Sequence, residues 1–389
     1  MNQNWTIKKM PEVVKWGSGG TPKATVKEYY ENGNIPWLII GDLNDEIVLK
    51  SESKITKLGL ENSSAKMLSK GTLLVAMYGS IGKLGITGIE CCANQAIAFA
   101  KELHGVTTKF MYYQMKLLKP KLISMGKGGT QKNISQTVLN SLDVIVPPIE
   151  EQELIVTKIE ELFSKLDKGV EELNKIKEQL KIYRQAVLKE AFESNIEYKP
   201  LGEISSSRLG KMLDKNKNTG EYRPYLRNIN VRWINFDLCE LLDMKIEESE
   251  LEKYTAKKGD LLMCEGGEPG RCAVWNMDYD ICYQKAIHRI RFNNNTNPKF
   301  YMYYFYYIAQ IGELSKYFTG TGIKHLTGES LKKVPVPVLD KDNQQSILKL
   351  IEQKLSVCDK IEQTVNESLQ KAESFRQSIL KQAFEGNLI

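Results

Sequence analysis

An internal repeat constrains this chain more than any other feature of its sequence. Residues 184–195 read RQAVLKEAFESN and residues 376–387 read RQSILKQAFEGN, so eight of twelve positions are identical at a spacing of 192 residues. Shorter echoes, such as KGTLL at 70–74 and KGDLL at 258–262, recur between the halves without a change of order. The chain is therefore a duplicated unit, in which each copy is a globular block followed by a helical segment.

The two helical segments have the pattern of a coiled coil. Residues 150–193 contain no proline, and their apolar residues recur at steps of three or four from Ile155 to Val187. Residues 347–383 keep a similar spacing, and such a narrow apolar seam is typical of a coiled coil rather than of a globular core. The sequence predicts four segments: blocks at 1–148 and 198–338, and helical spacers at 149–197 and 339–389.

Charge alternates along these segments. The first and second blocks carry net charges of +7 and +4, whereas the spacers that follow them carry −4 and −1. Two basic blocks are suited to face a polyanion such as nucleic acid, whereas the acidic spacers are suited to a different partner. Ordinary solvated surface charge is the alternative explanation.

Composition indicates a reduced protein outside the membrane. The seven cysteines include no CxxC pair, so they form neither a zinc-binding spacing nor an evident disulfide set. The N-terminus lacks the apolar stretch of a signal peptide, and no run approaches eighteen apolar residues. We therefore expect a cytoplasmic location, no membrane contact and no metal.

Three motifs resemble catalytic sites without completing one. FTGTG at 318–322 fits a methyltransferase cofactor loop, but ELSKY before it is predicted to be helical rather than a strand. Asp42, Glu52 and Lys54 have the spacing of a nuclease site, a pattern that arises often by chance. The three histidines of the chain are too few and too far apart in the sequence to indicate a nuclease site or a metal cluster. We predict no catalytic residue and no bound cofactor.

The aromatic run KFYMYYFYYIAQ at 299–310 allows two interpretations. It has the composition of a platform on which single-stranded nucleic acid stacks. Its aromatic residues also recur at helical spacing, which favours a helix buried under a sheet. Each block also contains one segment that is predicted to form a strand, a glycine turn and a second strand. These segments are residues 70–86 and 259–275.

The whole chain resembles the specificity (S) subunits of type I restriction-modification enzymes. The likeness rests on the block plan, on the run GGTQKNIS…VPPIEEQELI at 128–155, and on the twice-written RQxxLKxAFE. The second copy departs from it, since GTGIKHLT at 320–327 replaces GTQKNIS and two extra residues precede its glutamines.

The resemblance implies an α+β fold with two α/β target recognition domains, whose two long helices pair as an antiparallel coiled coil with a pseudo-two-fold repeat. It implies that each block reads half of a bipartite double-stranded DNA target. The expected partners are DNA, two methyltransferase subunits docked on equivalent surfaces, and restriction (translocase) subunits. Catalysis would belong to those other subunits. Two other functions remain open: the specificity chain of a related fused, type IIB-like restriction-modification enzyme, and a coiled-coil scaffold protein.

Lysines and arginines in glycine-rich turns are the predicted DNA contacts, because a short backbone approaches phosphates closely and a flexible cation reaches groove edges. Gln95 and Lys285 are added because they occupy matching positions with different chemistry, as expected for half-sites of different sequence. The predicted residues are Lys83, Gln95, Lys127 and Lys132 in the first block, and Arg208, Lys211, Arg227, Arg232, Arg271, Lys285 and Lys324 in the second.

Overall fold

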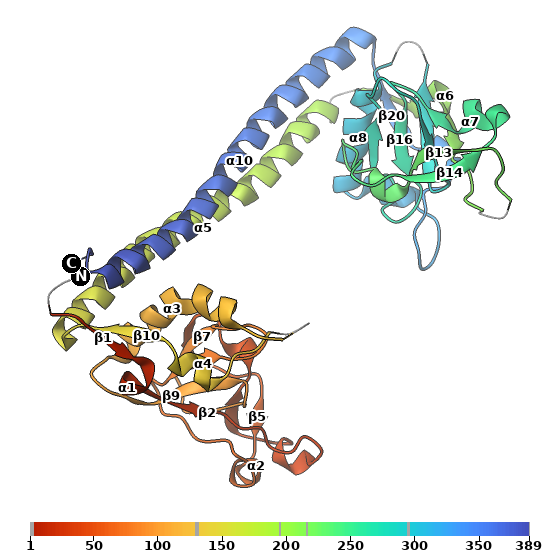
Figure 1. Ribbon diagram of the computed structural model, residues 1–389. Coiled ribbons are helices and arrows are strands. Elements are labelled where there is room, and N and C mark those ends of the chain that lie inside the picture. The colour runs from red at the N-terminus through yellow and green to blue at the C-terminus, as the bar shows by residue number, and fades with distance from the viewer. Residues whose placement is uncertain (1–3, 129–131, 194–195, 215–216, 294–295, 389) are drawn as a thin grey trace. The chain divides into compact units, whose positions relative to one another are not determined.

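The computed structural model describes residues 4–128, 132–193, 196–214, 217–293 and 296–388. The chain divides into two compact units, which are Met1–Leu173 with Glu367–Ile389 (unit 1) and Asn174–Asn366 (unit 2). Each unit therefore combines one globular block with segments of both long helices (Figure 1). Residues 129–131 of the GGTQKNIS motif lie outside the described residues.

The block of unit 1 is built on a five-stranded sheet of order β2-β9-β6-β7-β4, a three-stranded sheet of order β5-β3-β8 and the pair β1-β10. Its strands are β1 (Thr6–Lys9), β2 (Val14–Ser18), β3 (Ile35–Leu38), β4 (Glu46–Val48), β5 (Lys54–Ile55), β6 (Leu73–Ala76), β7 (Leu84–Thr87), β8 (Cys92–Ala93), β9 (Ile97–Leu103) and β10 (Asp143–Val146). Its helices are α1 (Met10–Val13), α2 (Lys57–Glu61), α3 (Thr108–Met125) and α4 (Gln136–Asn140), with 3₁₀ turns η1 (Lys27–Tyr29) and η2 (Ile40–Asp42).

The block of unit 2 has two four-stranded sheets, of orders β12-β19-β16-β17 and β14-β13-β18-β15, and the pair β11-β20. Its strands are β11 (Glu197–Pro200), β12 (Ser205–Leu209), β13 (Glu221–Leu226), β14 (Leu242–Ile246), β15 (Thr255–Ala256), β16 (Leu261–Cys264), β17 (Cys272–Val274), β18 (Ile281–Tyr283), β19 (Ile287–Phe292) and β20 (Pro335–Val338). Its helices are α6 (Leu201–Ile204), α7 (Leu251–Tyr254), α8 (Pro298–Gln310) and α9 (Gly328–Lys332), with 3₁₀ turns η3 (Asn228–Asn230), η4 (Glu248–Glu250) and η5 (Glu313–Tyr317).

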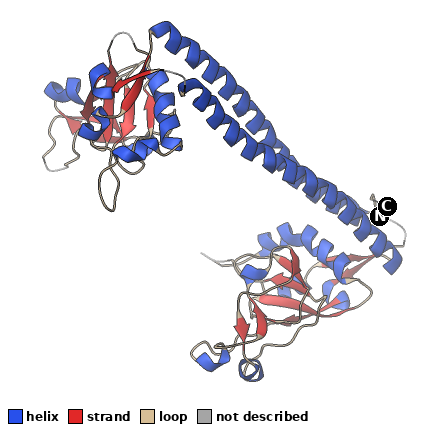
Figure 2. Cartoon of the chain, turned by 180° about the vertical axis from the view of Figure 1, so that it is seen from behind, coloured by secondary structure: helices blue, strands red, loops and turns tan. Residues whose placement is uncertain are grey.

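The two blocks share the central part of their topology, and in each of them helices flank the sheets (Figure 2). The strand order β2-β9-β6-β7 corresponds to β12-β19-β16-β17, whereas the edge strands differ, since β4 extends this sheet in unit 1 and β15 extends the other sheet in unit 2. The parallel pair β3 and β8 of unit 1 corresponds to the parallel pair β13 and β18 of unit 2. The hairpins β6-β7 and β16-β17 are antiparallel and occupy the two segments for which strand, glycine turn and strand were predicted. The duplication seen in the sequence is thus a duplication of the fold.

The long helices α5 (Ile149–Phe192) and α10 (Lys341–Glu385) pair with each other in both units. In unit 1 the Arg376 guanidinium pairs with Asp167, and in unit 2 the Arg184 guanidinium pairs with Asp359 at 2.5 Å. Residue numbers fall along one helix as they rise along the other, so the pairing is antiparallel. The predicted α+β fold with an antiparallel helix pair and an internal repeat is confirmed.

The end of each long helix packs on the globular block of its unit. In unit 1 the ring of Phe384, at the end of α10, lies 5.1 Å from the ring of Phe110 in α3. In unit 2 the ring of Phe192, at the end of α5, lies 5.3 Å from the ring of Phe300 in α8. Phe192 and Phe384 are each 1% exposed. The repeated AFE motif therefore anchors each helix end in an apolar core, and α3 corresponds to α8 with an offset of 190 residues.

A buried glutamine joins the start of each long helix to its block. Gln344 in α10 accepts a hydrogen bond from the Asn297 backbone N–H at 2.7 Å and donates one to the Leu339 carbonyl at 2.8 Å. Gln152 in α5 likewise accepts from the Thr107 backbone N–H at 2.9 Å. Both glutamines are fully buried. Water therefore cannot replace these hydrogen-bond partners if they are lost.

Gln344→Leu is expected to lower the free energy of unfolding by about 1–3 kcal/mol, because it removes the hydrogen-bond partner of the half-buried Asn297 N–H and of the half-buried Leu339 carbonyl. Urea unfolding measures the change. Gln345→Leu is the matched control, since Gln345 is exposed and is expected to change stability by about 0.5 kcal/mol or less. Equal destabilisation by both variants would contradict a specific role for the buried amide.

The structure settles the interpretation of the aromatic run 299–310. This run forms α8, and its residues Phe300, Tyr301 and Phe305 are fully buried in the core of unit 2. It is therefore a core helix and not a stacking platform.

The nuclease-like spacing has a local structural explanation. Asp42 accepts a hydrogen bond from the Ile39 backbone N–H at 2.8 Å at the start of η2.

Across the part of the chain that the structure describes, no cluster of three or more histidine, cysteine or carboxylate side chains is arranged to hold a metal ion. Within the same described part, none of the helices combines the length and the apolar character needed to span a membrane.

Candidate nucleic-acid interface

Four loops meet at one end of the five-stranded sheet of unit 1, where β2 and β6 end and β9 begins. Backbone hydrogen bonds join them, from Met77 N–H to the Ala96 carbonyl at 2.8 Å and from Gly79 N–H to the Lys132 carbonyl at 3.1 Å. The loops are residues 18–21, 77–83, 94–96 and the described parts of 126–135. This first loop cluster brings together all four residues predicted in the first block: Lys83, Gln95, Lys127 and Lys132.

Unit 2 repeats the arrangement at the corresponding end of its sheet. The Lys285 N–H donates to the Lys211 carbonyl at 2.6 Å, and the Leu326 N–H donates to the Glu265 carbonyl at 2.8 Å. The second loop cluster is made of residues 209–212, 265–271, 284–286 and 318–326, and it is the counterpart of the first in chain order and topology.

Two glycines allow the loops to approach this closely. A Cβ atom on Gly19 would lie 2.1 Å from the Asn94 carbonyl oxygen, and a Cβ atom on Gly210 would lie 2.2 Å from the Gln284 carbonyl oxygen. Any other residue would push the neighbouring turn away. The same close approach thus holds both loop clusters together.

The first loop cluster presents cations without internal partners. Lys127 and Lys132 are exposed and Lys83 is half-buried, and among the described residues none of the three has an ion-pair partner. The exposed Gln95 side chain accepts a hydrogen bond from the Thr21 hydroxyl. Free ammonium groups on a compact loop surface are suited to contact phosphates, because no internal ion pair has to be broken first.

The predicted cations of the second block fall into two groups. Arg208 and Lys285 are exposed and have no ion-pair partner among the described residues, while exposed Lys324 donates only to the Gly320 carbonyl at 2.9 Å. Arg227 pairs with Glu240 at 2.9 Å, and Arg232 pairs with Asp237 at 3.3 Å. These two arginines would have to exchange partners to bind DNA.

Lys211 and Arg271 have structural contacts. The Lys211 side chain is 11% exposed, pairs with Glu250 and lies 5.7 Å from the centre of the Tyr254 ring. A DNA contact would require that pair to open, so we leave Lys211 out of the proposed interface. Arg271 is 14% exposed on its side chain and donates to the Asn228 carbonyl at 2.8 Å, which ties the turn 265–271 to η3.

The structure adds residues that sequence reasoning missed. Tyr78 is 41% exposed beside Gly79, and it bridges to Asn133 in the first loop cluster. His325 is exposed in the second cluster, where a Cβ atom on Gly266 would lie 3.0 Å from its ring. The glycine next to Tyr78 was a usable signal, whereas the position of His325 depends on contacts between distant segments.

A buried histidine lies beneath the second loop cluster. His288 is 2% exposed, and its Nε2 atom lies 2.9 Å from the Leu326 carbonyl oxygen. Burial lowers the pKa of His288, because an imidazolium would lose its hydration there. His288 is therefore neutral near pH 7 and adds no positive charge to the surface.

The comparisons with known proteins identify the family. The model of the type I restriction modification DNA specificity domain matches the chain twice, at residues 2–181 and 193–371. The chain belongs to this family. The specificity-domain model thus covers both globular blocks and most of both long helices.

Curated members of the specificity-domain family are similar over different shares of the chain. The EcoKI specificity subunit of Escherichia coli K12 is 25% identical over 71% of this chain and 64% of its own length. The MjaIX specificity subunit of Methanocaldococcus jannaschii is 27% identical over 46% of this chain and 42% of its own length. The EcoDI specificity subunit of Escherichia coli is 22% identical over 99% of this chain and 89% of its own length. The match thus spans less than two thirds of the first two relatives.

Solved structures share the fold of this specificity-domain chain. A chain from a structure of a type I restriction-modification system has a TM-score of 0.82 at 14% identity, with 100% of this chain and 99% of that chain covered. The HsdS subunit of Thermoanaerobacter tengcongensis has a TM-score of 0.62 at 15% identity, with 100% and 98% covered. At these identities the likeness concerns the fold alone.

Proposed function

We propose that this chain is the DNA-recognition subunit of a type I restriction-modification system. Each block binds one half of a bipartite, asymmetric double-stranded DNA target through its loop cluster. The chain recruits two methyltransferase subunits and the restriction subunits, which carry out the chemistry, and it needs no cofactor of its own. It works in the cytoplasm, where the DNA is accessible.

One observation carries this proposal: the same end of both blocks holds a loop cluster with exposed cations that form no ion pair with any residue the structure describes. In unit 1 these are Lys127 and Lys132 beside half-buried Lys83. In unit 2 they are Lys285 and Lys324, and exposed Arg208 lies on β12 directly before the second loop cluster. Duplication of one surface on one fold is suited to two similar contacts with a double helix, while the differing side chains of the two clusters suit different base sequences.

Replacing Lys83, Lys127 and Lys132 together by alanine is expected to weaken DNA binding and to flatten the plot of log K against log salt by about two to three units. Each lost phosphate contact removes the release of about one counterion. Fluorescence anisotropy of a labelled duplex between about 50 and 200 mM salt, with the chain in complex with its methyltransferase subunits, measures both quantities.

The control is a triple alanine variant of Lys9, Lys15 and Lys57. These exposed lysines belong to the same block but pair with Asp143, Glu102 and Glu61, so the net charge changes by the same amount away from the loop cluster. The control is expected to keep a slope within about half a unit of the wild-type value. Equal changes in both triple variants would show that net charge, and not the loop cluster, governs binding.

A further inference from the structure

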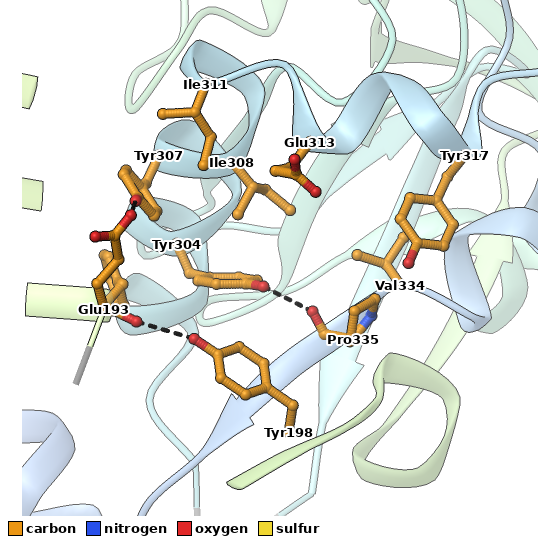
Figure 3. A pocket seen from close by; sticks show the side chains of 11 residues that line it. Glu193, Tyr198, Tyr304, Tyr307, Ile308, Ile311, Glu313, Tyr317, Val334 and Pro335 are labelled. Atoms are coloured by element: carbon orange, nitrogen blue, oxygen red, sulfur yellow. Dashed lines mark hydrogen bonds between the residues drawn. The ribbon is translucent and has the colours of Figure 1, made fainter. Parts of the chain in front are cut away.

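A cavity of about 450 Å³ lies in unit 2 between the end of α5, the strands β11 and β20, helix α8 and the turn η5 (Figure 3). Four tyrosines from three elements line it: Tyr198 of β11, Tyr304 and Tyr307 of α8, and Tyr317 of η5. The cavity is formed within unit 2 and is separate from the second loop cluster in its lining residues. Neither the fold nor the proposed DNA contact explains it.

Hydrogen bonds hold three of these rings in place. The hydroxyl of Tyr198 donates to the Phe192 carbonyl at 2.9 Å, and that of Tyr304 donates to the Pro335 carbonyl at 2.8 Å. The Tyr307 hydroxyl donates to Glu193 Oε1 at 2.6 Å. Because these protons are already used inside the protein, a ligand in the cavity meets fixed aromatic rings rather than free hydroxyl donors. The cavity is therefore preorganised.

Two exposed carboxylates line the cavity. Glu193 and Glu313 both line it, and Figure 3 shows the Glu313 carboxylate pointing between Ile308 and Tyr317. Burial is the main cause of the raised pKa of Tyr304, and the nearby negative charge of Glu313 contributes to the same shift. Among the lining residues that the structure describes there is no lysine or arginine. Aromatic rings and carboxylates together select for a cation.

Each carboxylate also has a lysine on its own helical turn. Lys316 pairs with Glu313 at 2.5 Å, and Lys189 pairs with Glu193 at 3.5 Å. Both lysine side chains are 65% exposed and lie outside the lining. Exposed pairs of this kind contribute little to stability, so a cation inside the cavity can share or replace them at small cost.

We propose that this cavity binds an organic cation that carries a guanidinium or alkylammonium group. The aromatic rings attract the positive charge through their quadrupoles, and the two carboxylates provide hydrogen-bond acceptors. The apolar atoms of Ile308, Ile311 and Val334 contact the carbon chain that carries the charge. The cation is either a free amine or the side chain of a basic residue on a bound protein.

Unit 1 does not repeat this site. The corresponding positions of α3 hold Gln114, Leu117 and Lys121 in place of Tyr304, Tyr307 and Ile311. At these positions an aliphatic chain replaces an aromatic ring and a positive charge replaces an isoleucine. Within the described ranges the proposed site is therefore formed by unit 2, although the fold is duplicated.

The test uses the full chain and three small probes observed by saturation-transfer NMR and calorimetry. Agmatine represents a free cation, N-acetyl-arginine methylamide represents a protein side chain, and N-acetyl-citrulline methylamide is the neutral isostere. We expect at least one cationic probe to bind once per chain with a dissociation constant of about 1 mM, and the citrulline probe to bind at least about tenfold more weakly. Binding of agmatine alone indicates a free amine, whereas binding of the arginine probe indicates a protein side chain.

Two variants locate the binding. Glu313→Gln removes one charge and is expected to weaken the cationic probe about three- to fivefold, and Tyr317→Leu is expected to weaken it about fivefold or more. Glu329→Gln is the matched control, because Glu329 forms an exposed pair with Lys332 of the same i,i+3 type in the same unit but lies outside the cavity. Equal affinity for the neutral probe, no binding of either cation, two sites per chain, or an equal loss in the Glu329→Gln control would each overturn the proposal.

Discussion

Phe384→Ala is expected to lower the stability of unit 1 by about 3–5 kcal/mol, because it removes a ring that is 1% exposed and packs on Phe110. The lost stability belongs to the N-terminal block, although the substitution lies near the C-terminus of the chain. Hydrogen exchange with mass spectrometry measures it peptide by peptide: amides of α3 lose protection, while amides of α8 in unit 2 are expected to change much less.

Phe375→Ala is the control on the same helix, since Phe375 is 57% exposed and its loss creates no cavity in a core. Phe192→Ala gives the reciprocal result, because Phe192 packs on Phe300, Tyr304 and Tyr307 of unit 2. If Phe384→Ala destabilised α8 as strongly as α3, the anchoring of each helix end in a separate core would be wrong.

Exchange of residues 1–148 for the same block of a relative is expected to change one half of the recognised DNA sequence completely and to leave the other half unchanged. Each block has its own sheets, its own core and its own loop cluster, so base contacts of one block do not depend on the side chains of the other. Sequencing of methylated sites in a host that carries the exchanged subunit with its methyltransferase measures the outcome.

The exchange must respect the contacts between block and helices. The donor block has to provide an aromatic residue at Phe110, to pack on Phe384, and a cation at Lys109, which pairs with Glu160 at 2.8 Å. Exchange of residues 198–338 is the reciprocal control and is expected to change only the other half-site. A change in both half-sites, or in neither, would refute independent reading by the two blocks.

Periodicity and repetition were sufficient to predict the large-scale organisation. The absence of proline from 150–193 and the apolar steps of three or four predicted α5, because these signals are local and the helix period is regular. The family resemblance rested on the repeated RQxxLKxAFE motif and the block plan, which the specificity-domain match confirms. The helical spacing of 299–310 also favoured the core helix α8 over a stacking platform.

Individual site residues were much harder to predict, because their availability depends on partners that are distant in the sequence. Lys211 and Lys285 both looked like surface cations, yet Lys211 is buried against Glu250, 39 residues away, whereas Lys285 is exposed. No local pattern distinguishes them, since the difference is created when β14 pairs with β13 and the turn η4 that follows it brings Glu250 to Lys211. The DNA contacts of the remaining cations stay predictions.

The sequence alone determined that the chain is duplicated, that two long helices alternate with two basic blocks, and which family it resembles, because these properties depend on local periodicity and on residue identity. Only the tertiary structure decided in which core each repeated phenylalanine packs and which cations form internal ion pairs. It also decided that four tyrosines and two carboxylates line one cavity in unit 2. The physical reason is that burial and pairing are properties of contacts between distant segments, and these contacts form only when the chain is folded.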